Sequence, residues 1–302
     1  MPTVFWTGKL TIPMMYLMNG NNLLAWITGN ARDARSMKKR IKEGYDGVYS
    51  EHVTRYDELG AGFQIKAATA QLEGMDLRGK TVLDVGCGTG IISFVALQKG
   101  AAKVTGGDIS NQMLEIARTK ADKLGYDADR IDFRWLDAEC LPFEDASFDF
   151  VITGQSFGFF PDQKKAVKEM VRILRPGNLL SVGAHGPEHY WEACDATLRA
   201  ASKKYLIGYR LEYWPRREEE VRRLLVEAGL VDVWTKRLTW RNTFKTGEEA
   251  YDFFAAISAT HWFAKVPANQ RDNESKKVRD YFGRKGVVTI TDDVIHAYGR
   301  KP

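Results

Sequence analysis

A glycine-rich turn, with an acidic residue beside it, is the part of this 302-residue chain best suited to binding a ligand. Residues 82–90 read VLDVGCGTG, an apolar strand that runs into a loop containing Gly86, Gly88 and Gly90. Glycines let the backbone turn sharply and approach a ligand, and the helix expected after the loop begins with unsatisfied N–H groups. Asp84 stands two residues before the first glycine. The pattern predicts a nucleotide-binding turn.

The spacing of these glycines differs from that of a dinucleotide fingerprint. The fingerprint is GxGxxG, whereas this loop is GxGxG, so pyrophosphate binding is disfavoured. Around the turn, short β-rich runs alternate with helical patterns of about ten to fifteen residues, which is typical of βαβ units around a parallel sheet. We expect strands at 81–85, 103–107, 131–135, 148–153, 178–182, 231–240 and 293–299.

Capping signals position the helices between these strands. Ser110 and Asp162 can each cap the N-terminus of a helix, and Gly125 suits a left-handed helix exit. The helix after Asp162 should stop at Pro176 and Gly177, which cannot continue it. Further helices are expected over 91–99, 187–205, 216–228, 246–262 and 267–282. Thr246 and Glu249 form a capping box at the start of the helix over 246–262.

VLDVGCGTG resembles motif I of the class I S-adenosylmethionine-dependent methyltransferases. The similarity continues in VTGGDIS, LDAECLPFEDASFDFV, FDFVITGQSFGFFPD and EMVRILRPGNLLSV. It covers about residues 75–183 and is to the ubiquinone, menaquinone and sterol methyltransferase branch (methyltransferase type 11). The resemblance implies an α/β, Rossmann-like fold, a seven-stranded and mostly parallel sheet with helices on both faces. The last strand should be antiparallel and lie beside the strand at 231–240.

The resemblance also implies a cofactor, S-adenosyl-L-methionine, with S-adenosyl-L-homocysteine as the product. Asp108 is placed to accept hydrogen bonds from both ribose hydroxyls. Asp137 would accept the adenine amine, and Tyr45 and Tyr56 would reach the methionyl end. The cofactor-binding residues implied in this way are Tyr45, Tyr56, Asp84, Gly86, Cys87, Gly88, Gly90, Asp108, Ile109, Met113, Asp137, Ala138, Glu139 and Thr153.

Few catalytic groups are expected, because a sulfonium methyl is already activated and its transfer needs mainly in-line positioning and exclusion of water. His185 follows the strand at 178–182, at the edge where open α/β sheets bind ligands, and is the candidate general base. His189 is the weaker candidate. The predicted substrate pocket has aromatic walls that suit an apolar or aromatic acceptor, and consists of Gln155, Phe157, Tyr190, Trp191 and Trp262. No metal site is predicted.

Changes in pattern near residues 75 and 183 divide the chain into three parts. Residues 1–74 form a helical N-terminal extension or lid, residues 75–183 the S-adenosylmethionine-binding core, and residues 184–302 the rest of the sheet. Helical insertions at 184–230 and 241–290 should lie over the carboxyl edge of the sheet and cap the substrate.

The predicted function is methyl transfer to O, C or N of a small apolar or aromatic acceptor. One alternative is a non-catalytic S-adenosylmethionine-binding sensor or partner subunit, which would keep the same adenine and ribose contacts. Another is an RNA methyltransferase, which would need a basic surface beside the pocket. The chain has 44 Lys and Arg against 39 Asp and Glu, a dispersed net charge of +5 that makes nucleic acid an unlikely partner.

Composition outside the core bears on location and partners. Three cysteines without a CxxC pair favour a reducing, cytoplasmic setting. Residues 3–42 combine apolar aromatic side chains with six cations between Arg32 and Lys42. Such a segment can dock peripherally on an anionic membrane, or it can fold back as a lid or pack in a homodimer interface.

Overall fold

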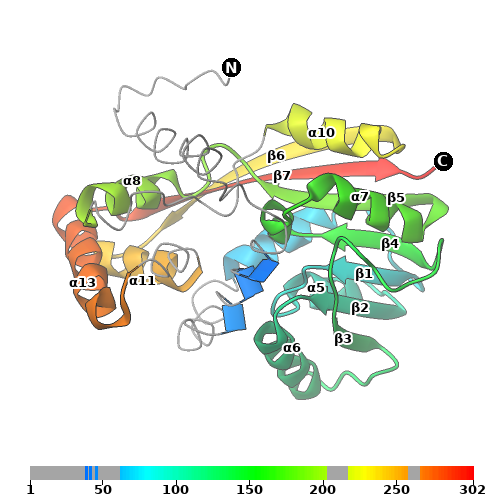
Figure 1. Ribbon diagram of the computed structural model, residues 1–302, viewed down its shortest axis with the longest axis horizontal. Coiled ribbons are helices and arrows are strands. Elements are labelled where there is room, and N and C mark those ends of the chain that lie inside the picture. The colour runs from blue at the N-terminus through cyan, green and yellow to red at the C-terminus, as the bar shows by residue number, and fades with distance from the viewer. Residues whose placement is uncertain (1–37, 40, 43–44, 47–61, 203–216, 258–265) are drawn as a thin grey trace.

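A computed structural model describes residues 38–39, 41–42, 45–46, 62–202, 217–257 and 266–302 of the chain. Its centre is a seven-stranded sheet in the order β3-β2-β1-β4-β5-β7-β6 (Figure 1). The strands are β1 Thr81–Val85, β2 Lys103–Asp108, β3 Ile131–Trp135, β4 Phe148–Thr153, β5 Leu174–His185, β6 Val231–Thr243 and β7 Thr289–Arg300.

The pairing of the strands confirms the expected fold. Strands β1 to β5 pair in parallel, whereas β7 is antiparallel to both β5 and β6. Strand β7 therefore lies beside β6, as the resemblance implied. The helices are α5 Ile91–Gln98, α6 Asn111–Lys123, α7 Gln163–Ile173, α8 Trp191–Ala200, α10 Glu218–Glu227, α11 Gly247–Ile257 and α13 Ala268–Lys285, with a 3-10 helix η1 Gln155–Phe159.

Apolar side chains on both faces of the sheet hold these helices. Val82 and Ile152 belong to a cluster with residues of α5 and α6, while their neighbours Leu83 and Val151 belong to a cluster with residues of α7 and α10. Successive side chains of a strand point to opposite faces, so each strand contributes to both cores. The central strands β1 and β4 are thus buried on both faces, which accounts for their continuous apolar runs in the sequence.

The capping predictions at the two central helices are confirmed. The Ser110 hydroxyl accepts a hydrogen bond from the N–H of Met113 (3.2 Å), and the Asp162 carboxylate accepts one from Lys165 (3.0 Å). Gly125 follows α6 with φ +73°, the left-handed conformation that glycine adopts without strain.

The end of α7 differs from the prediction. Helix α7 stops at Ile173, and the predicted strand at 178–182 is part of the longer β5, which includes Pro176 and Gly177. The register between β4 and β5 shifts in this stretch, and Gly177 has φ +78°. Proline and glycine therefore make an irregularity within the strand, where the missing proline N–H costs no ladder hydrogen bond.

Two other helix boundaries also differ from the predictions. Thr246 accepts the N–H of Glu249, but the Glu249 carboxylate accepts the N–H of Lys245, one residue earlier than in a capping box. Helix α11 ends at Ile257, and the predicted continuation to Trp262 lies outside the described residues. Helix α8 begins at Trp191, because residues 187–190 form a turn before it.

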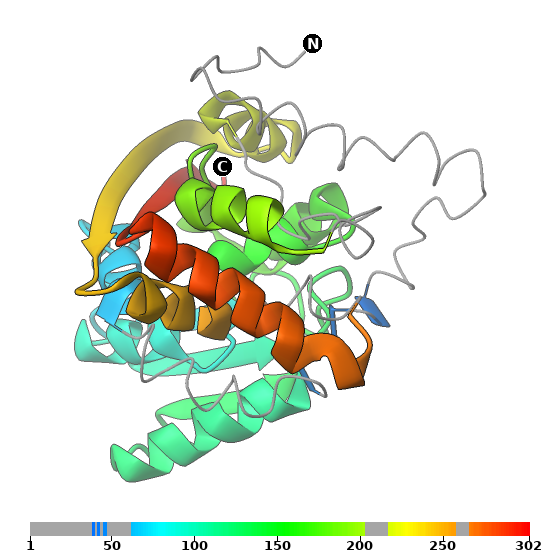
Figure 2. The same cartoon turned by 90° about the vertical axis from the view of Figure 1, so that its left-hand side faces the viewer.

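Helices α8, α11 and α13 gather beyond one end of the sheet, at the left of Figure 1 and in front in Figure 2. They share an apolar cluster that includes Phe253, Phe254 and Phe282. The same cluster contains Met113 of α6 and Tyr190 before α8, so it reaches the carboxyl ends of the parallel strands. The role of these helices as a substrate cap, and the three-part division of the chain, remain predictions.

One further string, GMDLRGKT at residues 74–81, matches the sequence pattern of a P-loop. A P-loop follows a strand and opens a helix. Here the order is reversed, because a helix over 62–71 precedes the string and Thr81 begins β1. The string is therefore a helix-to-strand connection and not a phosphate site.

Candidate functional site

A cavity opens where β1, β2 and β4 end, and it brings most of the predicted site together. The predicted residues that line it are Tyr45, Asp84, Gly86, Cys87, Gly88, Asp108, Ile109, Met113, Asp137, Ala138, Glu139, Gln155, His185 and Tyr190. These residues come from segments far apart in the sequence. Parallel strands end at the same edge of the sheet, so the loops that follow them meet there.

The structure places four predicted residues outside this lining. Gly90 packs against the rings of Phe94 and Phe133. Thr153 is buried, and its hydroxyl makes a hydrogen bond of 3.2 Å with the hydroxyl of Ser156. Phe157 is fully buried in the core beneath the sheet, and Trp191 is half-buried at the start of α8. The short turn of η1 sends Phe157 into the core and leaves Phe159 and Phe160 to line the cavity. Tyr56 and Trp262 lie outside the described residues.

The glycine loop brings its backbone close to two other elements. The N–H groups of Gly86 and Cys87 both donate to the carbonyl of Gly107, which ties the loop to β2. Gly86 has φ +72°, and a Cβ there would overlap the Ser156 side chain. Gly88 has φ +53°, and a Cβ at Gly88 would meet no atom of the protein. The space over Gly88 is therefore open for a ligand that approaches the backbone.

Asp108 ends β2 and orders the loops on either side of it. One carboxylate oxygen accepts the N–H of Gly88 and the other the N–H of Ser110, each at 2.9 Å. Burial raises the pKa of Asp108, while these backbone hydrogen bonds act against that rise. Each carboxylate oxygen can accept more than one hydrogen bond, so Asp108 can still accept donors from a ligand.

Asp84 is a buried carboxyl group at the end of β1, with one oxygen unsatisfied. Its side chain accepts a hydrogen bond from the Ser93 hydroxyl at 2.7 Å, and within the described part of the chain the oxygen Oδ1 has no partner. Burial, reinforced by the charge of Asp108, raises the pKa of Asp84 to about 7. A buried carboxylate oxygen beside a cavity is suited to a cationic or hydrogen-bond-donating ligand group.

Asp137 and Glu139 form the acidic end of the cavity, and Lys38 pairs with both. The Lys38 ammonium lies 2.7 Å from Asp137 and 2.8 Å from Glu139. Burial opposes its charge, but the hydrogen bonds to the two carboxylates raise the pKa of Lys38 above its usual value. In the sequence Lys38 stands out only as part of a basic stretch, because no local pattern marks a contact with residues about a hundred positions away.

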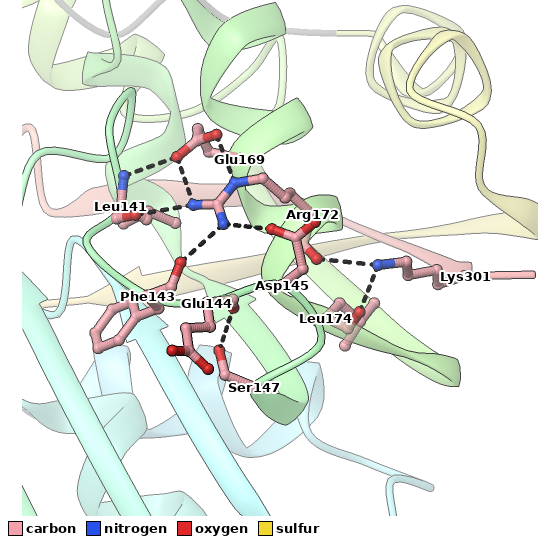
Figure 3. A network of polar contacts seen from close by, with 9 residues as sticks. All are labelled: Leu141, Phe143, Glu144, Asp145, Ser147, Glu169, Arg172, Leu174 and Lys301. Carbon is pink, nitrogen blue, oxygen red and sulfur yellow. Dashed lines mark hydrogen bonds and ion pairs between the residues drawn. The ribbon is translucent and has the colours of Figure 1, made fainter.

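Arg172 of α7 fixes the loop that follows Asp137 and Glu139 (Figure 3). Its guanidinium donates to the carbonyls of Leu141 and Phe143 and to Glu169, whose carboxylate also accepts the N–H of Leu141. Hydrogen bonds to Glu169 and Asp145 raise the pKa of Arg172, so it stays charged. The loop beside the acidic end of the cavity is thereby held to α7.

A second N-terminal contact lies at the start of α6. Asp46 accepts a hydrogen bond from the Ser110 hydroxyl (2.6 Å) and one from the N–H of Gln112. An acidic side chain at the N-terminus of α6 is favoured by the helix dipole. Next to it, the ring of Tyr45 packs edge-on against Phe159 at 6.0 Å. We call the described residues between 38 and 46 the strap, since they contact the cavity at both ends.

Three histidines line the other end of the cavity, of which the sequence favoured only His185. The rings of His185 and His189 are 4.2 Å apart, and His189 stacks on Tyr190 at 3.8 Å. The third, His296 of β7, is buried, and burial lowers its pKa to about 4. The short separation of His185 and His189 in the sequence indicated that the two rings could lie close together. No local pattern connected His296 to them.

The strand order, the glycine loop after β1 and the acidic residue at the end of β2 together define the class I methyltransferase fold. Residues 83–182 match the family model of the methyltransferase domain. These residues are therefore similar to a methyltransferase domain, and the relatives that match include quinone methyltransferases.

Individual relatives agree with this assignment. Over 142 residues the chain is 34% identical to demethylmenaquinone methyltransferase of Thermus thermophilus, covering 45% of this chain and 63% of that one. The phosphoethanolamine N-methyltransferase 2 of Haemonchus contortus, solved with phosphomonomethylethanolamine and S-adenosylhomocysteine, superposes with a TM-score of 0.57. The match covers 86% of this chain and 60% of that one at 20% identity.

A second similar structure is the [4+2]-cyclase SpnF, with a TM-score of 0.51 and 23% identity over 79% of this chain and 80% of that one. At this level of identity both structures show a shared fold only. The chain spans 37% to 63% of the lengths of the curated relatives it matches.

Proposed function

We propose that the protein is an S-adenosylmethionine-dependent methyltransferase that acts on O, C or N of a small apolar or aromatic acceptor. The observation that carries this proposal is that one cavity joins the glycine loop and four acidic residues to a group of aromatic and imidazole rings. The first group suits the cofactor, and the second suits an acceptor beside it.

The residues present fit the cofactor. The unsatisfied Oδ1 of Asp84 suits the α-ammonium of the methionyl part, and the open space over Gly88 suits a ligand that contacts the backbone. Asp108 would accept the ribose hydroxyls. Asp137 would accept the adenine amine, which requires Lys38 to share or release that carboxylate. When bound, the cofactor supplies an activated methyl group on sulfur.

The chain's own contribution is to position the acceptor and exclude water. Tyr45 and Phe159 face the cavity from the strap and η1, and Tyr190 faces it from the segment before α8. Because Tyr190 belongs to the apolar cluster of α8, α11 and α13, that wall is supported by the helices beyond the sheet. Such walls enclose an apolar acceptor and hold the reacting atoms in line, and positioning of this kind lowers the barrier of a two-reactant step.

The fold alone does not fix the reaction, as the [4+2]-cyclase with the same fold illustrates. A protein that only senses the cofactor would need no second compartment, whereas here the cavity extends to three histidines. That extension favours an enzyme.

The cofactor assignment can be tested by calorimetry with S-adenosylhomocysteine. Asp108→Ala should weaken binding about ten- to hundredfold, because it removes charge-assisted hydrogen bonds. Asp122→Ala, an exposed acidic residue of α6, is the matched control and should bind as the wild type does. Equal affinity in the wild type and Asp108→Ala would contradict the assignment.

The reaction itself can be tested with radiolabelled S-adenosylmethionine and the small-molecule fraction of a cell extract. Label in a product whose mass has increased by one methyl group would identify the acceptor. Binding without any labelled product, from extracts of several sources, would instead favour the sensor.

A cytoplasmic setting is part of the proposal, supported by Cys87, Cys140 and Cys194, which are all free thiols. Among the described residues, no helix has the length and apolar character needed to cross a bilayer. Likewise, no group of three or more histidine, cysteine or acidic side chains there could hold a metal ion. Homodimer formation remains a proposal, and the alternative of peripheral membrane contact through residues 3–42 is put to a test in the Discussion.

A further inference from the structure

We propose that Lys38 is a latch on the acidic end of the cavity. In the free protein it holds the carboxylates of Asp137 and Glu139, and it releases Asp137 but keeps Glu139 when an adenine amine binds. The inference rests on the proposed function, because it takes Asp137 as the acceptor of that amine. It adds a contact within the chain that the cofactor must displace, so the strap itself regulates the affinity of the site.

Lys38 and the ligand compete for one oxygen atom of Asp137. The other oxygen, Oδ1, accepts the N–H of Glu139 at 2.9 Å, which fixes the orientation of the carboxylate. Oδ2 accepts a hydrogen bond from the Lys38 ammonium at 2.7 Å. The Asp137 side chain is 24% exposed and lines the cavity, so a ligand can reach it. Oδ2 is therefore the oxygen that no backbone group holds, and an amine that binds there meets Lys38.

Glu139 provides Lys38 with a second acceptor, placed deeper in the protein. The Lys38 ammonium lies 2.8 Å from Oε2 of Glu139, while Oε1 accepts the N–H of Asp162 at 3.0 Å. The Glu139 side chain is only 5% exposed, so it is less accessible to a ligand than Asp137. An ammonium group has three N–H donors and can release one carboxylate while it keeps the other.

Charge balance favours this partial release over complete departure of Lys38. Asp137 and Glu139 contact the same ammonium, so their carboxylates are close neighbours that repel each other. An adenine amine is uncharged and cannot replace the positive charge of Lys38. If Lys38 stays on Glu139, a cation remains beside both carboxylates after the ligand has bound.

The latch belongs to one wall of the cavity. Lys38, Ile41 and Tyr45 all line the cavity, and the described residues of the strap are helical. Residues three and seven positions apart lie on one side of a helix, so this side of the strap faces the site. Release of Asp137 by Lys38 therefore loosens a wall of the cavity at its acidic end.

The other end of the strap is held by contacts that do not involve Asp137. Asp46 accepts hydrogen bonds from the Ser110 hydroxyl and from the N–H of Gln112 at the start of α6. These contacts can persist while Lys38 moves. The strap thus has one anchored end and one end whose ion pair competes with the ligand.

Lys38 differs in its position from the other ion-paired lysines. Among the described residues that line the cavity, it is the only lysine or arginine. Lys164 pairs with Glu227 at a similar distance of 2.8 Å, but both side chains are exposed and neither lines the cavity. The Lys164 pair therefore serves as a matched control for the Lys38 pair.

The first test is calorimetry with S-adenosylhomocysteine on Lys38→Met, which keeps an unbranched apolar side chain and removes the ammonium. We expect this variant to bind about three- to tenfold more tightly than the wild type, which is the scale of one partly buried ion pair. Lys164→Met should bind as the wild type does. Weaker or unchanged binding by Lys38→Met, with an unfolding midpoint near that of the wild type, would overturn the latch.

Salt provides a second readout that needs no variant of the latch. S-adenosylhomocysteine has no net charge, so screening acts mainly on the Lys38 ion pair. Raising sodium chloride from about 0.05 M to about 0.5 M should tighten binding to the wild type, and Lys38→Met should lose this response. A wild-type affinity that is constant or falls with salt would overturn the proposal, even if Lys38→Met fails to fold.

Glu139→Gln tests the role of the second acceptor. Without the Glu139 charge, Lys38 has only Asp137 as an anionic partner and competes more strongly, so binding should weaken about two- to fivefold. In the double variant with Lys38→Met, the same substitution should cost much less, because its effect passes through Lys38. An equal loss in both backgrounds would show that Glu139 acts on the ligand directly and would overturn the latch.

The outcomes separate this inference from the proposed function. If the wild type binds S-adenosylhomocysteine but fails any of the three tests, the latch is wrong and the cofactor assignment stands. If the wild type does not bind S-adenosylhomocysteine at either salt concentration, the cofactor assignment is wrong and this inference falls with it.

Discussion

At the scale of single residues, the protonation of Asp84 should be visible in the stability of the protein. Its pKa is raised from 3.8 to about 7 in the folded state, mainly by burial. Between about pH 4 and pH 7 the unfolded chain therefore releases a proton that the folded chain keeps. The unfolded state binds fewer protons, so the free energy of unfolding falls as pH rises through this window, by at most about 4 kcal/mol.

Asp84→Asn removes this titration, so the variant should lose less stability than the wild type as pH rises across the window. Guanidinium unfolding at several pH values measures the difference, with Asp122→Asn as the exposed control. If the wild type and Asp84→Asn lose stability in parallel, Asp84 is already ionised at low pH and its burial has been misjudged.

Two glycines of the loop should respond differently to the same substitution. Gly88 and Gly90 both have positive φ, so alanine costs about 1–2 kcal/mol at either position. A Cβ at Gly90 would also lie 2.8 Å from the Phe133 ring and 2.9 Å from the Phe94 ring, which adds about 1–3 kcal/mol of overpacking. At Gly88 the Cβ would enter the space proposed for the cofactor.

We therefore expect Gly90→Ala to lower the melting temperature more than Gly88→Ala does. We expect Gly88→Ala to weaken S-adenosylhomocysteine binding more than Gly90→Ala does, although it is the less destabilised of the two variants. Thermal unfolding and calorimetry on both variants measure these effects. The reverse order in affinity would show that the ligand does not contact the loop at Gly88.

At the scale of elements, the N-terminus of α6 joins helix stability to the strap. Ser110 caps α6, and its hydroxyl also donates to Asp46. Asp162 caps α7 in the same way, without a contact to the strap in the described residues. Removing either cap should cost about 1 kcal/mol in the free energy of unfolding.

Only Ser110→Ala should also release Asp46, so it should weaken S-adenosylhomocysteine binding while Asp162→Ala leaves binding nearly unchanged. Denaturant unfolding and calorimetry on the two variants make the comparison. If both variants bind the ligand equally well, Asp46 does not hold the strap over the cavity.

At the scale of the whole molecule, the strap bears on whether the N-terminal segment meets a membrane. Six cations lie between Arg32 and Lys42, but Lys38 is paired with Asp137 and Glu139, and Lys42 with Asp46. Each cation near anionic headgroups contributes about 1 kcal/mol to membrane binding. Cations already paired within the chain are not available for that contact.

We therefore expect full-length protein and a version lacking residues 1–30 to remain in the supernatant with vesicles of phosphatidylcholine and phosphatidylserine at low salt. Co-sedimentation measures this directly. Sedimentation of the full-length protein alone would show that residues 1–30 bind the membrane despite the pairing in the strap.

The sequence by itself determined the features that arise from local interactions. The glycine loop, the caps at Ser110 and Asp162 and the strands at 81–85, 131–135 and 148–153 were predicted because turn geometry, capping and side-chain periodicity depend on a few neighbouring residues. Asp84 and Asp108 were found because each stands at a short distance from the glycine loop or at a strand end.

The tertiary structure decided which distant residues complete the site. Lys38 meets Asp137 across 99 positions, and His189 meets the backbone of Asp293 across 104. No periodicity or motif encodes such pairs, because each joins segments that meet only in the folded chain. The contact of His189 arises when β7 pairs with β5 and brings Asp293 beside the turn after β5. For the same reason the sequence favoured His185 by its place at a strand end, whereas the position of His296 of β7 in the same cavity lining became visible only in the folded chain.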